Sequence, residues 1–235
     1  MKHNTRFNPT TNGPLHLGHI YAVLVNEYMA HETDGKFYVR FDDRSPTTRK
    51  FSQSQRTDIM DAQMETLKWL RIDVDGWSIE SELMKEYSIL DLLRRRGHFQ
   101  VNDDEGSPMP YFARLGPSYL AVQYIPQATA ERVALDELLG ITDVIRGEEF
   151  ATEFSLYYDY CRKWELHYPA FHFLPRLSGK RGDISKTNGG HTIDELRGLG
   201  WTPLDVKKAL AKACLHWPGS GWDIHNVKSS PFIDL

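Results

Sequence analysis

The stretch Pro14-Leu15-His16-Leu17-Gly18-His19 decides how the rest of the sequence is interpreted. It follows a turn-rich loop and opens an apolar pattern over 18–31 that recurs every three or four residues and predicts a helix, while residues 4–7 upstream predict a short strand. Free N–H groups at a helix start attract phosphates, and a glycine there lets a flat base approach the backbone. With His16 and His19 on one helical face, the stretch predicts a nucleotide-binding turn. Taken alone, it is equally consistent with a helix start that carries two surface histidines.

The flanking sequence predicts an α/β fold. Residues 36–41, KFYVRF, alternate as in a strand and end at Asp42 and Asp43. Further helices are predicted over 54–69, 80–96, 129–139 and 149–164, and further strands over 119–125 and 142–145. The order of strands and helices in the first hundred residues or so is typical of a parallel, mononucleotide-binding sheet.

The chain divides at a basic, glycine-rich loop over 177–190. We expect residues 1–190 to form a Rossmann-like domain, with a polar, turn-rich insertion at about 97–118 that is too short to be a domain of its own. Residues 191–235 are expected to form a small helical tail, with helices over 191–197 and 203–214.

Composition excludes several classes of protein. Hydrophobic residues make up 40% and charged residues 26% of the 235 residues, as in ordinary globular proteins. No apolar run could span a bilayer, and the N-terminus lacks the apolar core of a signal peptide, so we expect no membrane partner and a cytoplasmic location. Cys161 and Cys214 are too few for a cysteine-rich zinc site and are expected to be buried thiols without zinc. The net charge of −4 gives no support to binding of nucleic acid over the whole surface.

A second motif, Asp183-Ile184-Ser185-Lys186-Thr187, lies within the glycine-rich loop. A lysine on such a loop can close over the β- and γ-phosphates of a nucleotide and neutralise pyrophosphate as it leaves. By itself the motif is more typical of a solvated basic turn. Its significance comes from its position downstream of the histidine turn in the same α/β chain.

These motifs together resemble the glutamyl- and glutaminyl-tRNA synthetases of class I. TRFNPTTNGPLHLGH at 5–19 is similar to their opening, TRFxPxPxGxLHxGH, and RFDD at 40–43 matches their acidic motif. LGITDVIRGEE at 139–149 resembles MGITHVIRGED of the bacterial glutamyl enzymes. DISKT at 183–187 stands where the family has its KMSKS loop. The ordered motifs cover most of residues 5–212.

The resemblance implies ATP-dependent activation of an amino acid, with glutamate or glutamine favoured, and transfer to tRNA. Magnesium would accompany the ATP. The implied ATP-binding residues are His16, Gly18, His19, Ser185 and Lys186, of which His16, His19 and Lys186 are the implied catalytic residues. The implied amino-acid-binding residues are Arg6, Asn8, Thr10, Asp42 and Arg146.

Three of these residues have plain structural alternatives. Arg6 could be a surface residue of its strand. Asp42 could cap a strand end or pair with Arg40. Arg146 could form a salt bridge with Glu148 or Glu149 rather than read a carboxylate.

The sequence also departs from the family pattern. Ala128 stands where the family has a substrate-binding tyrosine, and Asp183 stands where a lysine is usual, with Lys180 or Arg181 as possible replacements. We expect no anticodon-binding region, and in this the chain resembles the truncated glutamyl-queuosine tRNA(Asp) synthetases. Its insertion is short, whereas those enzymes normally have a longer insertion with cysteine ligands. Two other functions therefore stay open: an adenylate-forming ligase with an acceptor other than tRNA, and a non-catalytic nucleotide-binding relative.

Overall fold

The computed structural model describes residues 1–87, 99–101, 108–110, 119–180, 182–184 and 191–234. Its first half confirms the predicted α/β order. Strands β1 (Thr5–Phe7), β2 (Phe37–Phe41) and β3 (Gly76–Ile79) pair in parallel in that order. They are connected by helix α1 (Leu17–His31), a short 3-10 turn η1 (Pro46–Thr48) and helix α2 (Gln53–Trp69). Parallel strands need such crossover helices, because the chain must return to the same end of the sheet.

The second half adds a parallel pair on the other side of β1. Strand β6 (Asp143–Gly147) pairs with β7 (Ala170–Leu174) through η3 (Glu148–Glu153) and helix α6 (Phe154–Trp164). The Asn4 carbonyl accepts hydrogen bonds from the amides of Thr142, at 3.0 Å, and Asp143, at 3.2 Å. This places β6 beside β1. The chain therefore builds outward from β1 in one direction and then in the other, and such a reversal of strand order creates a crevice where α/β sheets bind ligands.

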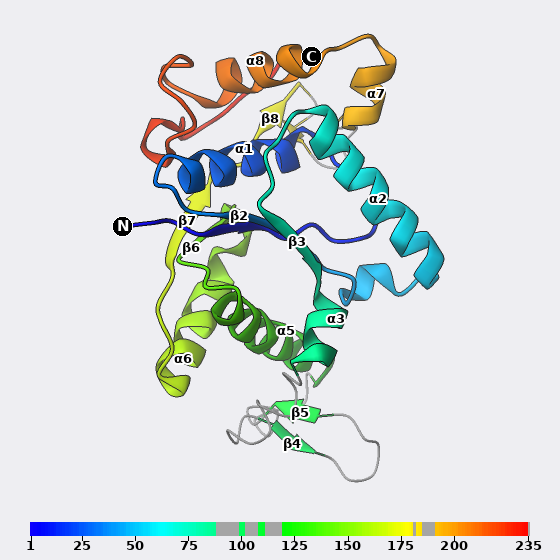
Figure 1. Cartoon of the computed structure of the whole chain (residues 1–235), viewed down its shortest axis with the longest axis vertical. Helices are drawn as coiled ribbons and strands as arrows, with labels where there is room; N and C mark the ends of the chain where they lie inside the picture. The colour runs from blue at the N-terminus through cyan, green and yellow to red at the C-terminus, as the bar shows by residue number, and fades with distance from the viewer. Residues whose placement is uncertain (88–98, 102–107, 111–118, 181, 185–190, 235) are drawn as a thin grey trace.

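Helices cover both faces of this layer. Figure 1 shows α1 and α8 (Pro203–Cys214) above the strands and helices α5 (Tyr119–Leu138) and α6 below them. The upper core contains Ile20, Val23 and Leu24 of α1, at 2% exposure or less, together with Leu210 of α8. The predicted tail thus shares the core of α1. A second cluster joins α5, α6 and the short helix α3 (Glu80–Glu86).

Local sequence signals explain where several helices begin. Ser52 with Gln55, and Thr202 with Asp205, form reciprocal capping boxes at the starts of α2 and α8. Thr192 and Glu195 do the same for α7 (Ile193–Gly198). The predicted helix over 203–214 coincides with α8, because its cap, its first-turn proline and its apolar period agree.

The predicted strand over 119–125 is wrong, because these residues are the first part of α5. A short apolar run suits a buried strand and a buried helix equally well, and here it continues into the helical period of the residues that follow. Pro126 lies within the same helix and does not end it. The predicted helix over 129–139 is therefore the second part of a longer one.

Other boundaries also differ. Residues 149–164 form η3 followed by α6, and α3 ends at Glu86, so the rest of the predicted helix over 80–96 falls outside the described residues apart from Tyr87. Strands β3 and β7 were not predicted from the sequence. Within the expected insertion, β4 (Phe99–Val101) and β5 (Pro108–Pro110) pair antiparallel. The loop over 177–190 begins as a hairpin of β8 (Ser178–Gly179) and β9 (Gly182–Asp183), and η4 (Ile224–Asn226) lies in the tail.

Two expectations from composition can be compared with the described residues. None of the described helices has the length and apolar character needed to cross a bilayer. Cys161 and Cys214 are buried and unbonded, as predicted, and burial raises the pKa of each thiol to about 12. Both thiols are therefore protonated and unreactive at neutral pH.

Candidate active site

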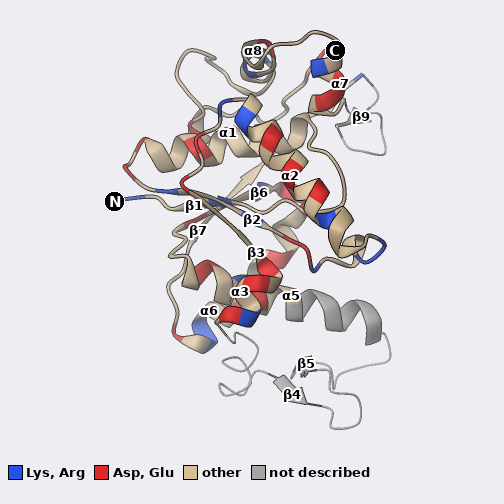
Figure 2. Ribbon diagram, turned by 45° about the vertical axis from the view of Figure 1, so that its right-hand side comes forward, with Lys and Arg blue, Asp and Glu red and all other residues tan. Residues whose placement is uncertain are grey.

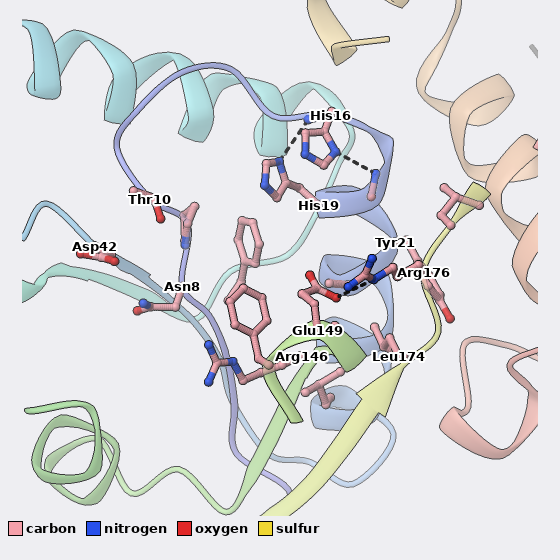
Figure 3. Close-up of a pocket in the computed structure, with 18 of the residues that line it drawn as sticks. Asn8, Thr10, His16, His19, Tyr21, Asp42, Arg146, Glu149, Leu174 and Arg176 are labelled. Carbon is pink, nitrogen blue, oxygen red and sulfur yellow. Dashed lines mark hydrogen bonds and ion pairs between the residues drawn. The ribbon is translucent and has the colours of Figure 1, made fainter. Parts of the chain in front are cut away.

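A cavity of about 700 Å³ lies where the strand order reverses. Its walls come from the carboxyl ends of β1, β6 and β7 and from the start of α1. It brings together all the implied site residues that lie in the described ranges: Arg6, Asn8, Thr10, His16, Gly18, His19, Asp42 and Arg146. Figure 3 shows His16 and His19 on one side of the cavity and Arg146 on the other. A cavity of this volume accommodates a nucleotide-sized ligand.

The two histidines cap the start of α1. The His16 Nδ1 accepts from the Gly18 amide at 3.2 Å, and the His19 Nδ1 accepts from the His16 amide at 3.2 Å. The rings stack with centroids 3.7 Å apart. Because each Nδ1 acts as an acceptor, the neutral rings are assigned as the tautomer with the proton on Nε2. The helix start therefore presents two ring N–H donors beside its positive dipole end.

Gly18 keeps this surface close to the backbone. A Cβ at this position would approach the His16 ring to 3.1 Å and the Ile184 carbonyl oxygen to 3.5 Å. A side chain here would therefore force the His16 ring to shift by a few tenths of an ångström. This packing, in addition to the approach of a flat base, accounts for a glycine between the histidines.

Arg6 is buried rather than on the surface. Its Nε and Nη2 donate to the two oxygens of Asp136, at 3.1 and 3.2 Å. Asp136 also accepts from Arg40 Nη1 at 2.6 Å and from the Tyr157 hydroxyl at 2.9 Å. Asp136 is buried, and the two guanidiniums hold the pKa of its carboxyl far below the usual range although burial alone would raise it. Arg6 thus reaches the cavity with its orientation fixed from behind by Asp136.

Asp42 follows β2 and lies at the cavity wall. Its Oδ1 accepts from the amides of Arg44, at 3.1 Å, and Ser45, at 2.8 Å. Capping, one alternative considered from the sequence, is therefore present. The other is not, because Arg40 donates to Asp136, Glu80 and Asn8 instead. Asp42 is 5% exposed, and its backbone carbonyl accepts from the Thr11 amide, at 3.1 Å, on the loop that leads to the histidines.

Asn8 and Thr10 lie on that loop. The Asn8 Oδ1 accepts from Arg40 Nε at 3.0 Å, and Gln63 of α2 donates to the carbonyls of Thr10, at 3.2 Å, and Gly13, at 2.7 Å. These hydrogen bonds fix the path of the loop between β1 and α1. Both predicted residues therefore line the cavity from a braced backbone.

Arg146 is at the end of β6 and bonds to a different acid from those considered. Its Nη1 donates to Glu153 at 3.0 Å, and its guanidinium lies 4.2 Å from the centre of the Phe150 ring. Glu149 instead pairs with Arg176 at 3.9 Å (Figure 3). Burial and the positive charge of Arg132 lower the pKa of Arg146 to about 10, so it remains charged at neutral pH.

Ser185 and Lys186 lie outside the described residues, as does Arg181. The hairpin that leads to them runs along the cavity, since Leu177 and Ile184 are among its lining residues. Lys180, considered as a replacement for the missing loop lysine, donates to the carboxylate of Asp234 at 2.6 Å. It is directed to the tail in this structure rather than to the cavity.

Three residues near the site were not found from the sequence: Arg132, Asp136 and Glu153. Arg132 is four residues after Ala128, so both occupy one face of α5. Ala128 is 9% exposed and lines a side chamber of about 100 Å³ that shares Asp42 and Arg132 with the main cavity. The i, i+4 spacing of Ala128 and Arg132 could have indicated that Arg132 lies near the site. It was not used, because the helix was predicted to begin after Ala128.

Among the described residues, no group of three or more His, Cys, Asp or Glu side chains could hold a metal ion. The same region contains a nucleotide-sized cavity and a helix start with two imidazoles. The described residues therefore fit a nucleotide.

Comparisons with known proteins agree with this geometry. Residues 2–98 match the family model described as tRNA synthetases class I (E and Q), catalytic domain. A glutamate–tRNA ligase of Sulfolobus acidocaldarius is 34% identical over 42% of this chain and 17% of its own length. Glutamate–tRNA ligase 1 of a Wolbachia species is 24% identical over 88% of this chain and 60% of its own length. The chain thus spans less than two thirds of the length of these relatives.

Solved structures share the fold. A glutamate tRNA ligase of Elizabethkingia meningosepticum, in complex with its amino acid, superposes with a TM-score of 0.70 at 16% identity, over 100% of this chain and 67% of that one. A tyrosyl-tRNA synthetase of Archaeoglobus fulgidus gives 0.60 at 17% identity, over 80% of this chain and 60% of that one. Residues 2–98, which include the histidine turn, are therefore similar to the catalytic domain of the glutamyl and glutaminyl class I tRNA synthetases, and the chain shares the fold of these solved synthetase structures.

Proposed function

We propose that this protein activates an amino acid with ATP and transfers it to tRNA, with glutamate or glutamine as the amino acid. The observation that carries the proposal is a single cavity whose one side is the histidine-capped start of α1 and whose other side holds Arg6, Asp42 and Arg146. Ligands bound on the two sides would meet in the middle, where a carboxylate could approach a phosphate. The family match and the relatives' names support the same reaction.

In the proposed reaction, a carboxylate oxygen of the amino acid attacks the α-phosphorus of ATP. The bond from that phosphorus to the bridging oxygen breaks, and pyrophosphate leaves with the electron pair. The Nε2 donors of His16 and His19 would stabilise the negative charge that spreads onto the phosphate oxygens during this displacement. Gly18 would lie under the base, and Ser185 and Lys186 would neutralise the leaving pyrophosphate.

The amino acid would bind at the other side of the cavity. Asp42 would pair with the α-ammonium group, supported by its position at the cavity wall and its 5% exposure. Arg6 would contact the amino acid and Arg146 would contact the end of its side chain, with Asn8 and Thr10 between the two sites. Magnesium would enter bound to the ATP phosphates, which is its usual manner of binding at such sites.

The acceptor is proposed from the family rather than from charge. Figure 2 shows that acidic and basic residues are mixed along α2, α3 and α7. On α8, Lys208 and Lys212 are exposed, whereas the Lys207 ammonium donates to the Arg71 carbonyl at 3.4 Å. Labelled amino acid, ATP and bulk tRNA would test the acceptor. Activation without labelled tRNA would contradict transfer to tRNA while leaving activation intact.

Amino-acid-dependent exchange of pyrophosphate into ATP, measured against each of the twenty amino acids, tests activation. We expect glutamate or glutamine to give the highest rate, and His19→Ala to reduce that rate by at least about a hundredfold, since one lost donor to a developing charge has about that effect. His167→Ala is the control, because His167 is exposed on the loop between α6 and β7. A better response to an apolar amino acid, or an unaffected His19→Ala variant, would contradict the proposal.

A further inference from the structure

Two arginines in the cavity converge on a single internal carboxylate. Arg132, from α5, and Arg146, from the end of β6, both donate through Nη1 to the same oxygen of Glu153, at 3.2 and 3.0 Å. All three side chains line the cavity, and they are 16–21% exposed. Glu153 comes from η3, a third element. Three separate parts of the chain therefore meet to place one negative charge between two positive charges inside the site.

The two arginines of the cluster are held in place, but most of their N–H donors have no acceptor among the described residues. The Phe150 ring lies against Arg146, 4.2 Å from its guanidinium, and fixes the plane of that group. A guanidinium has five N–H donors. Within the described part of the chain, the hydrogen bond to Glu153 is the only one that each of these two guanidiniums makes. Their other donors are available to a ligand or to water.

The charges of the cluster do not cancel. Two guanidiniums and one carboxylate leave a net single positive charge. Arg6 is close enough to Arg146 for its positive charge to act on the pKa of Arg146, but Arg6 already has Asp136 as its partner. A ligand that completes the cluster should therefore carry one negative charge, and planar guanidiniums match a carboxylate in shape.

We propose that Glu153 is a specificity-determining residue: an internal carboxylate that partly occupies the Arg132–Arg146 site and weakens the binding of an acidic amino-acid side chain relative to its neutral amide. This inference rests on the proposed function. A substrate carboxylate bound to the same arginines lies near the carboxylate of Glu153, so the two like charges repel. An amide in the same position carries no charge and is not penalised. Glu153 thereby reduces the preference in binding affinity for glutamate over glutamine.

The test compares wild-type protein with Glu153→Gln, which keeps the shape and removes the charge. KM values for glutamate and for glutamine are measured by pyrophosphate exchange. We expect the KM for glutamate to fall about fivefold and that for glutamine to change less than about twofold, the size expected for one screened charge interaction at a partly exposed site. Glu137→Gln is the matched control, because Glu137 is exposed on the same helix as Arg132 and this substitution also removes one negative charge. It should change neither KM.

Glutamate binding measured by calorimetry gives a readout that does not depend on catalysis. Tighter binding to Glu153→Gln supports the inference, and unchanged or weaker binding overturns it. Equal increases in KM for both amino acids would also overturn it, because they would show that Glu153 only braces the two arginines. If Glu153→Gln does not fold, Glu153→Ser is measured in the same way. Wild-type protein that binds glutamate but gives no exchange with any amino acid would contradict the proposed function and not this inference.

Discussion

Two clusters in this protein each join two arginines to one carboxylate but differ in their exposure to solvent. In the buried cluster, Arg6 and Arg40 share the carboxylate of Asp136, whose side chain is 1% exposed. In the cavity cluster, Arg132 and Arg146 share the carboxylate of Glu153, whose side chain is 21% exposed. Each has two guanidiniums on one acid. The comparison teaches that residue types alone do not decide whether such a cluster holds the fold together or binds a ligand.

Burial decides the difference through solvation. In the buried cluster no water can replace a lost partner, so each group depends on the others. Tyr157 adds a further hydrogen bond to Asp136, and Glu80 pairs with the far side of Arg40 at 3.2 Å. In the cavity cluster, water or a substrate can take the place of any partner. Substitutions in the buried cluster should therefore reduce the stability of the fold, and substitutions in the cavity cluster should mainly change ligand binding.

The largest expected effect is on the buried cluster. Asp136→Ala leaves two guanidiniums inside the protein without their shared carboxylate, and removing one side of a buried charge cluster costs about 3–5 kcal/mol. Urea unfolding measures the loss. Glu137→Ala, the exposed neighbour on the same helix, is the control and should cost less than about 0.5 kcal/mol. A loss below about 1 kcal/mol for Asp136→Ala would remove the distinction between the clusters.

A smaller effect is expected from the pH dependence of Glu80. Burial raises the pKa of Glu80 from 4.5 to about 7. The positive charge of Arg40 opposes this rise, and the nearby negative charge of Asp42 adds to it. Between these values the folded protein holds a proton that the unfolded chain has lost. Stability attributable to Glu80 is therefore full below about pH 4.5 and falls as the pH rises toward 7, by at most about 3 kcal/mol.

Glu80→Gln tests this dependence, since an amide does not titrate. Between pH 5 and pH 8 wild type should lose about 2 kcal/mol of stability that the variant keeps. The free energy of unfolding of the variant minus that of wild type should therefore increase by this amount. Urea unfolding at several pH values in that range measures it. A difference between the two proteins that stays constant with pH would show that Glu80 is ionised throughout the range.

The smallest stability effect is expected from the cavity cluster. Glu153→Gln should lower the free energy of unfolding by no more than about 1 kcal/mol, because partly exposed ion pairs contribute little. The same variant is predicted above to change glutamate binding about fivefold. Thermal or urea unfolding of the protein used for the kinetic measurements supplies the number. A loss above about 2 kcal/mol would show that the cavity cluster, like the buried one, stabilises the fold.

The elements that the sequence predicted well are those whose signals are local. The strand at 4–7, the helix over 18–31 and the helix at 203–214 each combine a periodic apolar pattern with a cap or turn, and each has its counterpart in β1, α1 or α8. The motif around His16 and His19 likewise predicted a helix start. The capping bonds made by the imidazoles were not foreseen, because they depend on ring orientation.

The elements that were missed have weak local signals. Strands β3 and β7 have half-buried patterns, and parallel pairing with β2 and β6 defines them. The first part of α5 was taken for a strand because a short apolar run fits both structures. Whether such a segment becomes a strand or a helix depends on its packing against a sheet or another helix. The residues next to it in the sequence do not determine that packing.

By itself, the sequence determined the α/β class, the position of the helix start that carries His16 and His19, and which residues match the synthetase pattern. Only the tertiary structure decided what each charged residue does. It gave Arg6 and Arg40 a shared buried acid, and it placed Glu153 between Arg132 and Arg146 in an open cavity. The physical reason is that capping and periodicity act between residues close in the chain, whereas the energy of a charge depends on its solvation and on partners that folding brings from distant segments.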